Sequence, residues 1–216
     1  MPPSHFAVFK GRLATPMYVK NQILQLAITG MTAEGMGVGK DDGFAVFVEG
    51  ACVGDLLCVR LVKVLKHYAF GKIEKILSPS AHRIEPDCPV FSRCGGCSYR
   101  NITYSHELSL KRTRIVDALE RIGGISVEVP PVLPSPQTEH YRNKAQYPVG
   151  YDKEGNLVAG FYAGRTHSII ANTDCAIQHP CNHRILETIL AFMKQYDISA
   201  YEEKKHTGLV RHILTR

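Results

Sequence analysis

Three cysteines close together carry the clearest chemical signal in the sequence. Cys88, Cys94 and Cys97 follow a C-x5-C-x2-C spacing, and Gly95 and Gly96 separate the last two. A glycine has no Cβ to block a positive φ or a close approach to a bound group, so the backbone can turn tightly here. The spacing therefore predicts three thiolates that face one common centre.

A metal centre of this kind needs a fourth ligand, and Cys175 and Cys181 are the candidates outside the N-terminal strands. Four thiolates suit either zinc or an iron–sulfur cluster. Structural zinc more often uses two paired C-x2-C motifs, and this chain has one, so the spacing favours iron–sulfur over zinc and over free thiols. Cys52 and Cys58 stand among Val and Leu and are expected to be small core residues.

The positive charge of the chain is concentrated in one region. Lys and Arg number 26 against 20 Asp and Glu, and the whole excess falls within residues 57–123, which hold twelve basic and six acidic side chains. Such a concentration predicts a polyanionic partner, and RNA is the expected one. Tyr68 and Phe70 are either base-stacking or core aromatics. The candidate RNA-binding residues are Lys63, Lys66, Lys72, Lys75, Lys111, Arg112, Arg114, Arg142 and Lys144.

Composition excludes several classes of protein. Hydrophobic residues make up 44% and charged residues 21%, which is ordinary globular usage and argues against wholesale disorder. No apolar run approaches the roughly 18 residues that a bilayer span needs, and the N-terminus shows no secretory signal. Seven cysteines without such a signal indicate a reducing compartment. We therefore expect a cytoplasmic protein with no membrane partner and no disulfide framework.

Short strands must position the first part of the charged region. Residues 22–29, 43–48, 56–65 and 68–77 read as strands separated by Gly- and Asp-rich turns. Strands at this spacing within about sixty residues predict a five-stranded barrel of the OB type.

A helix and a second set of strands follow the cysteines. Residues 104–122 read as a helix whose apolar stripe consists of Leu108, Ile115, Leu119 and Ile122. After a Pro-rich connector, the sequence predicts a hairpin of residues 144–150 and 157–162, a strand at 167–171, a helix at 183–196 and a strand that begins at 209–214.

The cysteine motif and the basic helix together resemble the iron–sulfur branch of the RNA uracil-C5 methyltransferase family, whose best-known member modifies 23S rRNA. The predicted barrel resembles the TRAM domain of that family, an RNA-binding OB-like module, in two stretches. These are Gly35-Met36-Gly37-Val38 and Phe47-Val48-Glu49-Gly50. Further stretches match the central domain of the family in the family's order: Tyr141-Arg142-Asn143-Lys144, Gln146-Tyr147-Pro148-Val149-Gly150, the segment around Gly160-Phe161-Tyr162, and Asp174-Cys175-Ala176-Ile177.

The resemblance implies a ligand set and a division into domains. By that likeness Cys175 joins Cys88, Cys94 and Cys97 as the fourth ligand of a 4Fe–4S cluster. The expected fold class is α+β and mostly β, with an N-terminal OB-like TRAM barrel, a Cys-rich iron–sulfur loop and helix, and the start of a mixed α/β central domain. The expected boundaries are a poorly ordered leader at 1–20, the TRAM domain at 21–79, the iron–sulfur loop and basic helix at 80–128, and the incomplete central domain at 137–216.

The resemblance also implies an enzyme whose chemistry lies elsewhere. The S-adenosylmethionine-binding Rossmann-like domain, the nucleophilic Cys and the general base of the family have no counterpart in these motifs, so the chain is interpreted as an N-terminal part without its catalytic domain, and inactive by itself. The expected full enzyme forms 5-methyluridine in rRNA, acts as a monomer and uses S-adenosylmethionine. The alternatives are a tRNA-directed member, a stand-alone RNA-binding module with a structural metal and, third, an iron–sulfur electron carrier.

Overall fold

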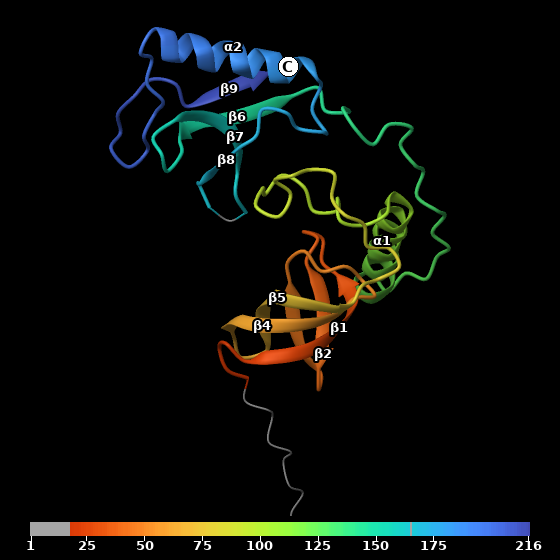
Figure 1. The fold of residues 1–216 in the computed structure, drawn as a ribbon. Coiled ribbons are helices and arrows are strands. Elements are labelled where there is room, and N and C mark those ends of the chain that lie inside the picture. Colours follow the sequence, from red (N-terminus) through yellow and green to blue (C-terminus); the bar gives the residue numbers. More distant parts are fainter. Residues whose placement is uncertain (1–17, 165) are drawn as a thin grey trace, which may run out of the picture.

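Residues 18–164 and 166–216 are described by a computed structural model, and they form a barrel, a linking segment with one long helix, and a four-stranded sheet covered by a second helix (Figure 1). Most of the expected leader at 1–20 lies outside the described residues. None of the helices within the described ranges is both long and apolar enough to cross a membrane.

Five strands close the N-terminal barrel in the order β1-β2-β3-β5-β4. Their bounds are Ile23–Met31 (β1), Gly37–Asp41 (β2), Phe44–Val48 (β3), Leu56–Val64 (β4) and Tyr68–Ser78 (β5). Alternate side chains such as Val46, Leu57 and Val59 point inward and are fully buried. The barrel predicted from the sequence is therefore present, with β2 as the strand that the sequence did not indicate.

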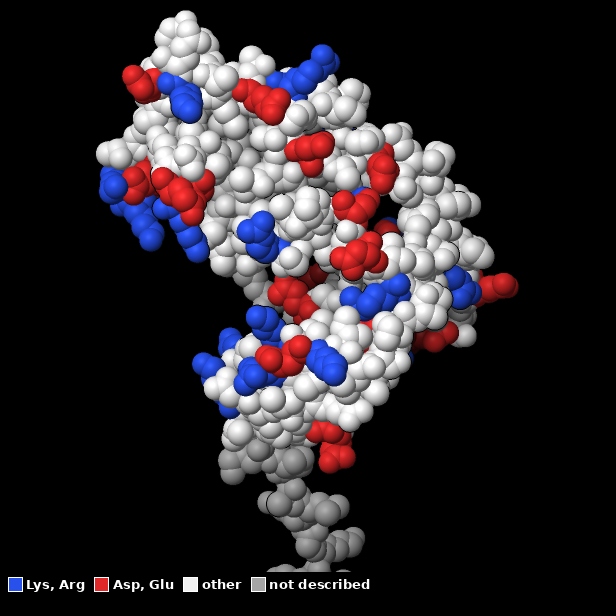
Figure 2. All heavy atoms as spheres, viewed as in Figure 1, with Lys and Arg blue, Asp and Glu red and all other residues white. Residues whose placement is uncertain are grey.

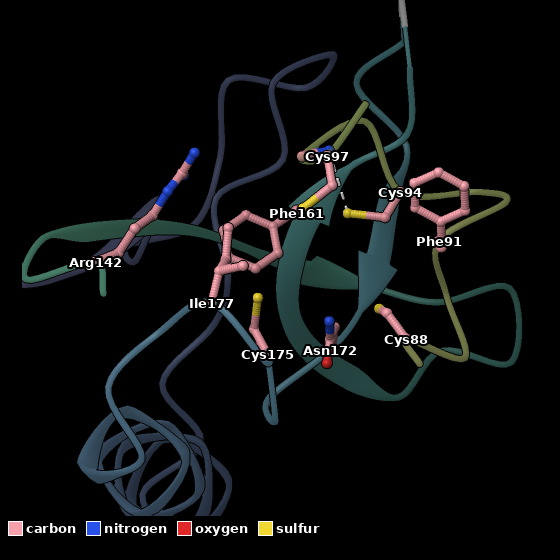
Figure 3. Close-up of a pocket in the computed structure, with 10 residues that line it drawn as sticks. Cys88, Phe91, Cys94, Cys97, Arg142, Phe161, Asn172, Cys175 and Ile177 are labelled. Atoms are coloured by element: carbon pink, nitrogen blue, oxygen red, sulfur yellow. Dashed lines mark hydrogen bonds between the residues drawn. The ribbon is translucent and has the colours of Figure 1, made fainter. Parts of the chain in front are cut away.

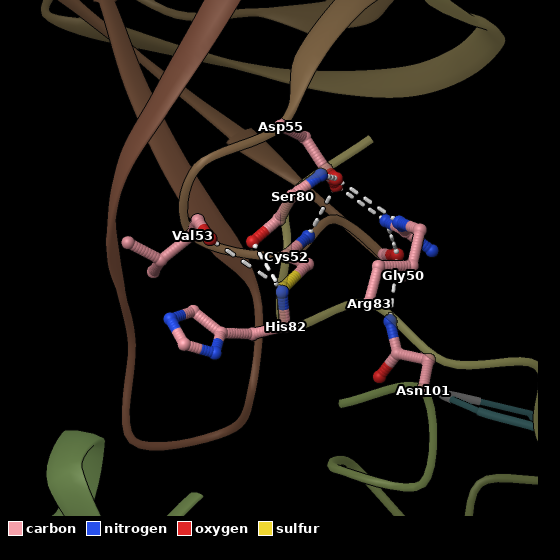
Figure 4. Close-up of polar contacts among 8 residues, drawn as sticks. All are labelled: Gly50, Cys52, Val53, Asp55, Ser80, His82, Arg83 and Asn101. Carbon is pink, nitrogen blue, oxygen red and sulfur yellow. Dashed lines mark hydrogen bonds and ion pairs between the residues drawn. The ribbon is translucent and has the colours of Figure 1, made fainter. Parts of the chain in front are cut away.

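The buried carboxylate of Asp55 joins the barrel to the segment that leads to the cysteines (Figure 4). Asp55 accepts hydrogen bonds from the backbone N–H groups of Cys52 and Ser80 and from the guanidinium of Arg83. Arg83 and the side chain of Asn101 both donate to the carbonyl oxygen of Gly50. Ser80 and Arg83 lie before the cysteines and Asn101 lies after them. These bonds therefore attach both ends of the cysteine segment, residues 80–101, to the barrel turn that contains Gly50 and Asp55.

The helix after the cysteines differs from the prediction. It runs as α1 over Tyr104–Asp117 and ends in a π-helical turn, η1, over Ala118–Ile122. No residue of either element is buried among the described residues, and Ile115 and Ile122 of the expected stripe are 47% and 87% exposed. The stripe is therefore only partly covered, because Leu108 and Leu119 are half-buried while Ile115 and Ile122 are exposed.

The last part of the chain forms its own sheet and core. The strands are β6 (Ala145–Tyr151), β7 (Leu157–Tyr162), β8 (Ile169–Ala171) and β9 (His212–Thr215), and their order is β8-β7-β6-β9. Helix α2 (Cys181–Gln195) lies along this sheet and buries Leu186 and Met193 against Tyr147 and its neighbours (Figure 1).

All the strand pairs of this sheet are antiparallel. The expected mixed α/β arrangement is thus corrected to an antiparallel sheet with a helix on one face, because hairpin turns connect β6, β7 and β8 and the chain returns through α2 to place β9 antiparallel beside β6.

Candidate metal centre

Four cysteines from two distant segments line one small pocket (Figure 3). Cys88, Cys94 and Cys97 come from the loop before α1, and Cys175 comes from the segment between β8 and α2. The walls of the pocket are largely apolar and include Phe91, Phe161 and Ile177. The structure therefore brings together all four residues that the sequence and the resemblance selected as ligands.

The cysteine loop is attached to the second sheet through its backbone. Cys94 forms an isolated β-bridge with Ala163, and the N–H of Gly95 donates to the carbonyl oxygen of Tyr162 at 3.0 Å. A Cβ on Gly95 would lie 3.0 Å from both the nitrogen of Gly164 and that carbonyl oxygen. Neither Gly95 nor Gly96 has a positive φ, so Gly95 serves here through close approach to β7 and not through an unusual turn.

The segment that carries Cys175 is held by backbone bonds on its other side. The N–H groups of His140 and Arg142 donate to the carbonyl oxygens of Ala176 and Ile177 at 2.9 and 3.0 Å. A turn bond from the N–H of Gln178 to the carbonyl oxygen of Cys175 measures 2.9 Å. The position of Cys175 is therefore fixed by backbone bonds at Cys175 itself and at the two residues that follow it.

Cys181 lies elsewhere. It is the first residue of α2, its Sγ is 3.0 Å from Nδ1 of His179, and it is not among the residues that line the pocket. Cys52 is buried in the turn before β4, as expected, but Cys58 is half-buried on β4 between the inward-facing Leu57 and Val59, so the expectation that it is a core residue is wrong. All seven cysteines are free thiols.

The environment of the pocket favours neutral thiols when no cation is present. Burial raises the pKa of the Cys94 thiol, and the neighbouring Cys175 and Cys88 raise it further, although the N–H of Gly96 opposes them. Burial also raises the pKa of Cys97, while Arg100 and Arg142 act in the opposite direction. A bound cation would reverse this balance, because a coordinating thiol is deprotonated by the metal.

The donor set of this pocket is four cysteine thiols, which is the ligand chemistry of zinc centres and of iron–sulfur clusters. No group of three or more His, Cys, Asp or Glu side chains in residues 18–164 and 166–216 is arranged to hold a metal ion. Instead, the four sulfurs surround an open centre with apolar walls (Figure 3). Four thiolates can hold either a zinc ion, with each sulfur about 2.3 Å from one point, or a larger iron–sulfur cluster.

The candidate RNA-binding residues fall into two groups. Lys63, Lys66, Lys72 and Lys75 are exposed on β4, β5 and the turn between them. Figure 2 shows Lys and Arg side chains gathered on one side of the barrel, with acidic side chains among them. Other candidates are engaged within the chain. Lys111 is paired with Glu107 at 2.5 Å, and Arg112 donates to the carbonyl oxygen of Val129 at 2.7 Å.

The remaining candidates lie apart from the barrel. Arg114 is exposed on α1, Lys144 is exposed just before β6, and Arg142 lines the cysteine pocket. The sequence analysis did not predict that Arg142 lines the pocket, since 45 positions separate it from Cys97. Backbone pairing of Arg142 with Ile177 and Gln178 brings it there.

Comparison with known proteins defines the class. Residues 20–73 match the TRAM domain family. The chain is 43% identical to an uncharacterized RNA methyltransferase of Clostridium tetani and 40% identical to one of Halalkalibacterium halodurans, in each case over 91% of this chain and 43% of the relative. Residues 20–73 are thus similar to a TRAM domain, and nearly the whole chain is similar in sequence to part of RNA methyltransferases, as the motifs indicated.

One solved structure shows the same fold. The crystal structure of the Pyrococcus abyssi tRNA (uracil-54, C5)-methyltransferase in complex with S-adenosyl-L-homocysteine matches with a TM-score of 0.61 and 24% identity, over 88% of this chain and 42% of that one. The chain thus spans less than half the length of the proteins that it matches.

These matches correct one part of the predicted fold class. The chain was expected to be an N-terminal part from which the catalytic domain is absent, and that description is wrong. Methyltransferase relatives match 91% of the chain and a methyltransferase structure matches 88% of it, so nearly all of its residues align with methyltransferase sequence or structure.

Proposed function

We propose that this chain provides RNA recognition and an iron–sulfur centre to an S-adenosylmethionine-dependent RNA uracil-C5 methyltransferase of the cytoplasm, with rRNA as its substrate. One observation carries the proposal: Cys175 lies 78 positions beyond Cys97, yet both line one pocket that is joined to a TRAM barrel. RNA methyltransferase relatives over 91% of the chain support the reaction class.

The proposed ligands are Cys88, Cys94, Cys97 and Cys175, and the proposed cofactor is a 4Fe–4S cluster. Such a centre would link the cysteine loop to the segment between β8 and α2, which otherwise meet through few contacts between the two backbones. Its role in this proposal is structural, because the pocket walls are apolar and the cluster joins segments that carry the RNA-binding barrel and the second sheet.

The residues of this chain contribute binding and orientation to the reaction. The exposed lysines on β4 and β5 would bind phosphates of the RNA. The cysteine centre would hold the barrel and the second sheet in a fixed arrangement, so that both contact the same RNA. S-adenosylmethionine, when bound, supplies the methyl group. The target uridine must leave its base stack to be modified at C5, so a surface that holds the surrounding RNA in an opened form serves that step.

The cluster is tested by purification of the protein under anaerobic conditions. We expect a brown protein with broad visible absorbance and about four irons and four sulfides per chain. Cys94→Ser should abolish both, because Ser is a poor ligand for this centre, and Cys175→Ser should do the same. Cys181→Ser is the matched control and should retain the iron. Stoichiometric zinc with negligible iron would contradict the cluster.

A tRNA substrate is the second candidate, because the matching solved structure is a tRNA methyltransferase. Binding to a uridine-containing rRNA hairpin and to a tRNA transcript, measured side by side at the same salt concentration, distinguishes the two. We expect the hairpin to bind more tightly. Tighter binding of the tRNA would assign the chain to tRNA, and no binding of either would refute the RNA-recognition role.

A further inference from the structure

Three aromatic rings form a cluster on the outer face of the barrel. The ring centroids of Phe47 and Tyr68 are 5.5 Å apart, those of Tyr68 and Phe70 are 5.7 Å apart, and those of Phe47 and Phe70 are 5.8 Å apart. Tyr68 is 37% exposed and Phe47 is half-buried. An aromatic cluster on the outside of a small barrel contributes nothing to its core, which lies on the other face of the same strands.

The register of the strands explains why these rings meet. Strand β3 pairs with β5 in parallel, and Phe47 is opposite Phe70. Val46, Val48 and Ala69 alternate with the rings and point into the barrel, so the rings must point out. Tyr68 lies two positions before Phe70 on the same face of β5.

Cations border the aromatic cluster on two sides. Lys63 on β4 is opposite Phe70 on β5, so a row of Phe47, Phe70 and Lys63 crosses three neighbouring strands. Lys72 follows Phe70 by two positions and is exposed on the same side. Within residues 18–164 and 166–216, Lys63 forms no ion pair, whereas Arg60 of the same strand is paired with Glu74. The cluster therefore combines ring faces with a cation free to meet an anion.

We propose that this outer face, formed by Phe47, Tyr68 and Phe70 with Lys63 and Lys72, is a stacking platform for unpaired bases of single-stranded RNA. The inference rests on the proposed RNA-recognition function and specifies the form of RNA that the barrel takes. A strand of RNA presents both a π-face and a phosphate at every nucleotide, which matches rings bordered by lysines. A duplex offers only its phosphates here, because its base faces are stacked within the helix.

The absence of tryptophan from the 216 residues allows a direct test in this chain. Tyr68→Trp introduces one Trp into a sequence that has none. We expect single-stranded RNA to quench its fluorescence at the concentrations at which the RNA binds. Tyr196→Trp, at a 58% exposed position beyond α2, is the matched control and should be quenched much less. Equal quenching of the two variants would overturn the platform.

A second variant separates stacking from folding and from charge. Phe47→Leu combined with Tyr68→Leu retains apolar side chains but removes two ring faces. Anisotropy titrations should show at least about tenfold weaker binding of single-stranded RNA. The dependence of log K on log salt should be unchanged. Lys63→Ala with Lys72→Ala should instead flatten that slope by about 1.4, which is about 0.7 for each lost phosphate contact on a single strand.

The outcomes distinguish this inference from the proposed function. If the unmodified protein binds single-stranded RNA and the double Leu variant binds it equally well, the platform is wrong and RNA recognition stands. Equal affinity of the unmodified protein for a duplex of the same sequence also overturns the platform. If the unmodified protein binds no RNA of either form, the proposed function fails together with it.

Discussion

The guanidinium of Arg83 lies against the carboxylate of Asp55, with Nε 3.0 Å from Oδ1, and this ion pair connects the barrel to the cysteine segment. Asp55 is 1% exposed, and the N–H groups of Cys52 and Ser80 donate to its two oxygens at 2.7 and 2.9 Å. A buried charge whose lone pairs are all used in this way tolerates no loss of a partner.

Asp55→Ala is expected to lower the free energy of unfolding by about 3 to 5 kcal/mol, because it leaves the Arg83 guanidinium and two backbone N–H groups without their acceptor. Urea denaturation followed by circular dichroism measures this loss. Glu74→Ala, which removes the partner of Arg60 in an ion pair open to solvent, is the control and should have a much smaller effect. A similar decrease in the free energy of unfolding for the two variants would show that Asp55 does not hold the cysteine segment to the barrel.

The same carboxylate predicts a pH dependence of stability. Burial alone would raise the pKa of Asp55, but hydrogen bonds from Arg83, Ser80 and Cys52 outweigh burial and lower it. A carboxyl whose pKa is lowered in the folded state stabilises the protein above the unfolded value of about 3.9, and this stabilisation is lost as the pH falls toward the folded value.

The difference in unfolding free energy between the unmodified protein and Asp55→Asn isolates this contribution from that of other carboxylates. It should be constant above about pH 5 and should shrink below about pH 4. Urea titrations at several pH values measure it. A difference in unfolding free energy that stays constant or widens down to about pH 3 would contradict a lowered pKa of Asp55 in the folded state.

The sequence predicted those strands of the barrel in which large apolar side chains occupy alternate positions. Val46 with Val48, and Leu57 with Val59, show which face points inward. Strand β2 gives no such signal because its inward positions are glycines. A Cβ on Gly39 would lie 2.5 Å from the side chain of Leu26, so only glycine fits at that position and the strand reads as a turn.

The cysteine ligands could be predicted from the sequence because three of them share one loop. The contacts that position this loop could not be predicted. Asp55 and Arg83 are 28 positions apart, and neither stands in a motif. Phe47 was not selected because its partner Phe70 is brought beside it by a parallel pairing that the order of strands does not reveal. Contacts between distant segments depend on strand register, which local patterns do not determine.

Gly95→Ala is expected to reduce the iron content of the protein. The added Cβ would lie 3.0 Å from the backbone of Tyr162 and Gly164, so the loop must move away from β7 and carry Cys94 and Cys97 with it. Gly96→Ala is the matched control, since its Cβ would meet only the Sγ of Cys94, at 3.4 Å. Iron and sulfide analysis after anaerobic purification measures the effect. Equal iron in the two variants would show that the docking of the loop on β7 does not position the cysteines.

Removal of the metal should loosen the cysteine segment while both folded cores persist. The barrel has its own core, which includes Leu26 and Val59, and the second sheet has another, which includes Tyr147 and Leu186. Residues 86–99 bury little apolar surface of their own, with Val90 at 9% exposure as their buried hydrophobic residue. A segment with so few packed side chains depends on cross-links for its order.

Hydrogen exchange of the protein before and after treatment with a chelator measures this difference. We expect amides of residues 86–99 and 172–177 to exchange faster after metal loss, while those of β4 and β6 keep their protection, because their hydrogen bonds lie within sheets that have separate cores. Cys88→Ser should reproduce the faster exchange without a chelator, and Cys181→Ser should not. Faster exchange throughout β4 and β6 would show that the centre supports the whole fold, and unchanged exchange of residues 86–99 would show that it does not hold the loop.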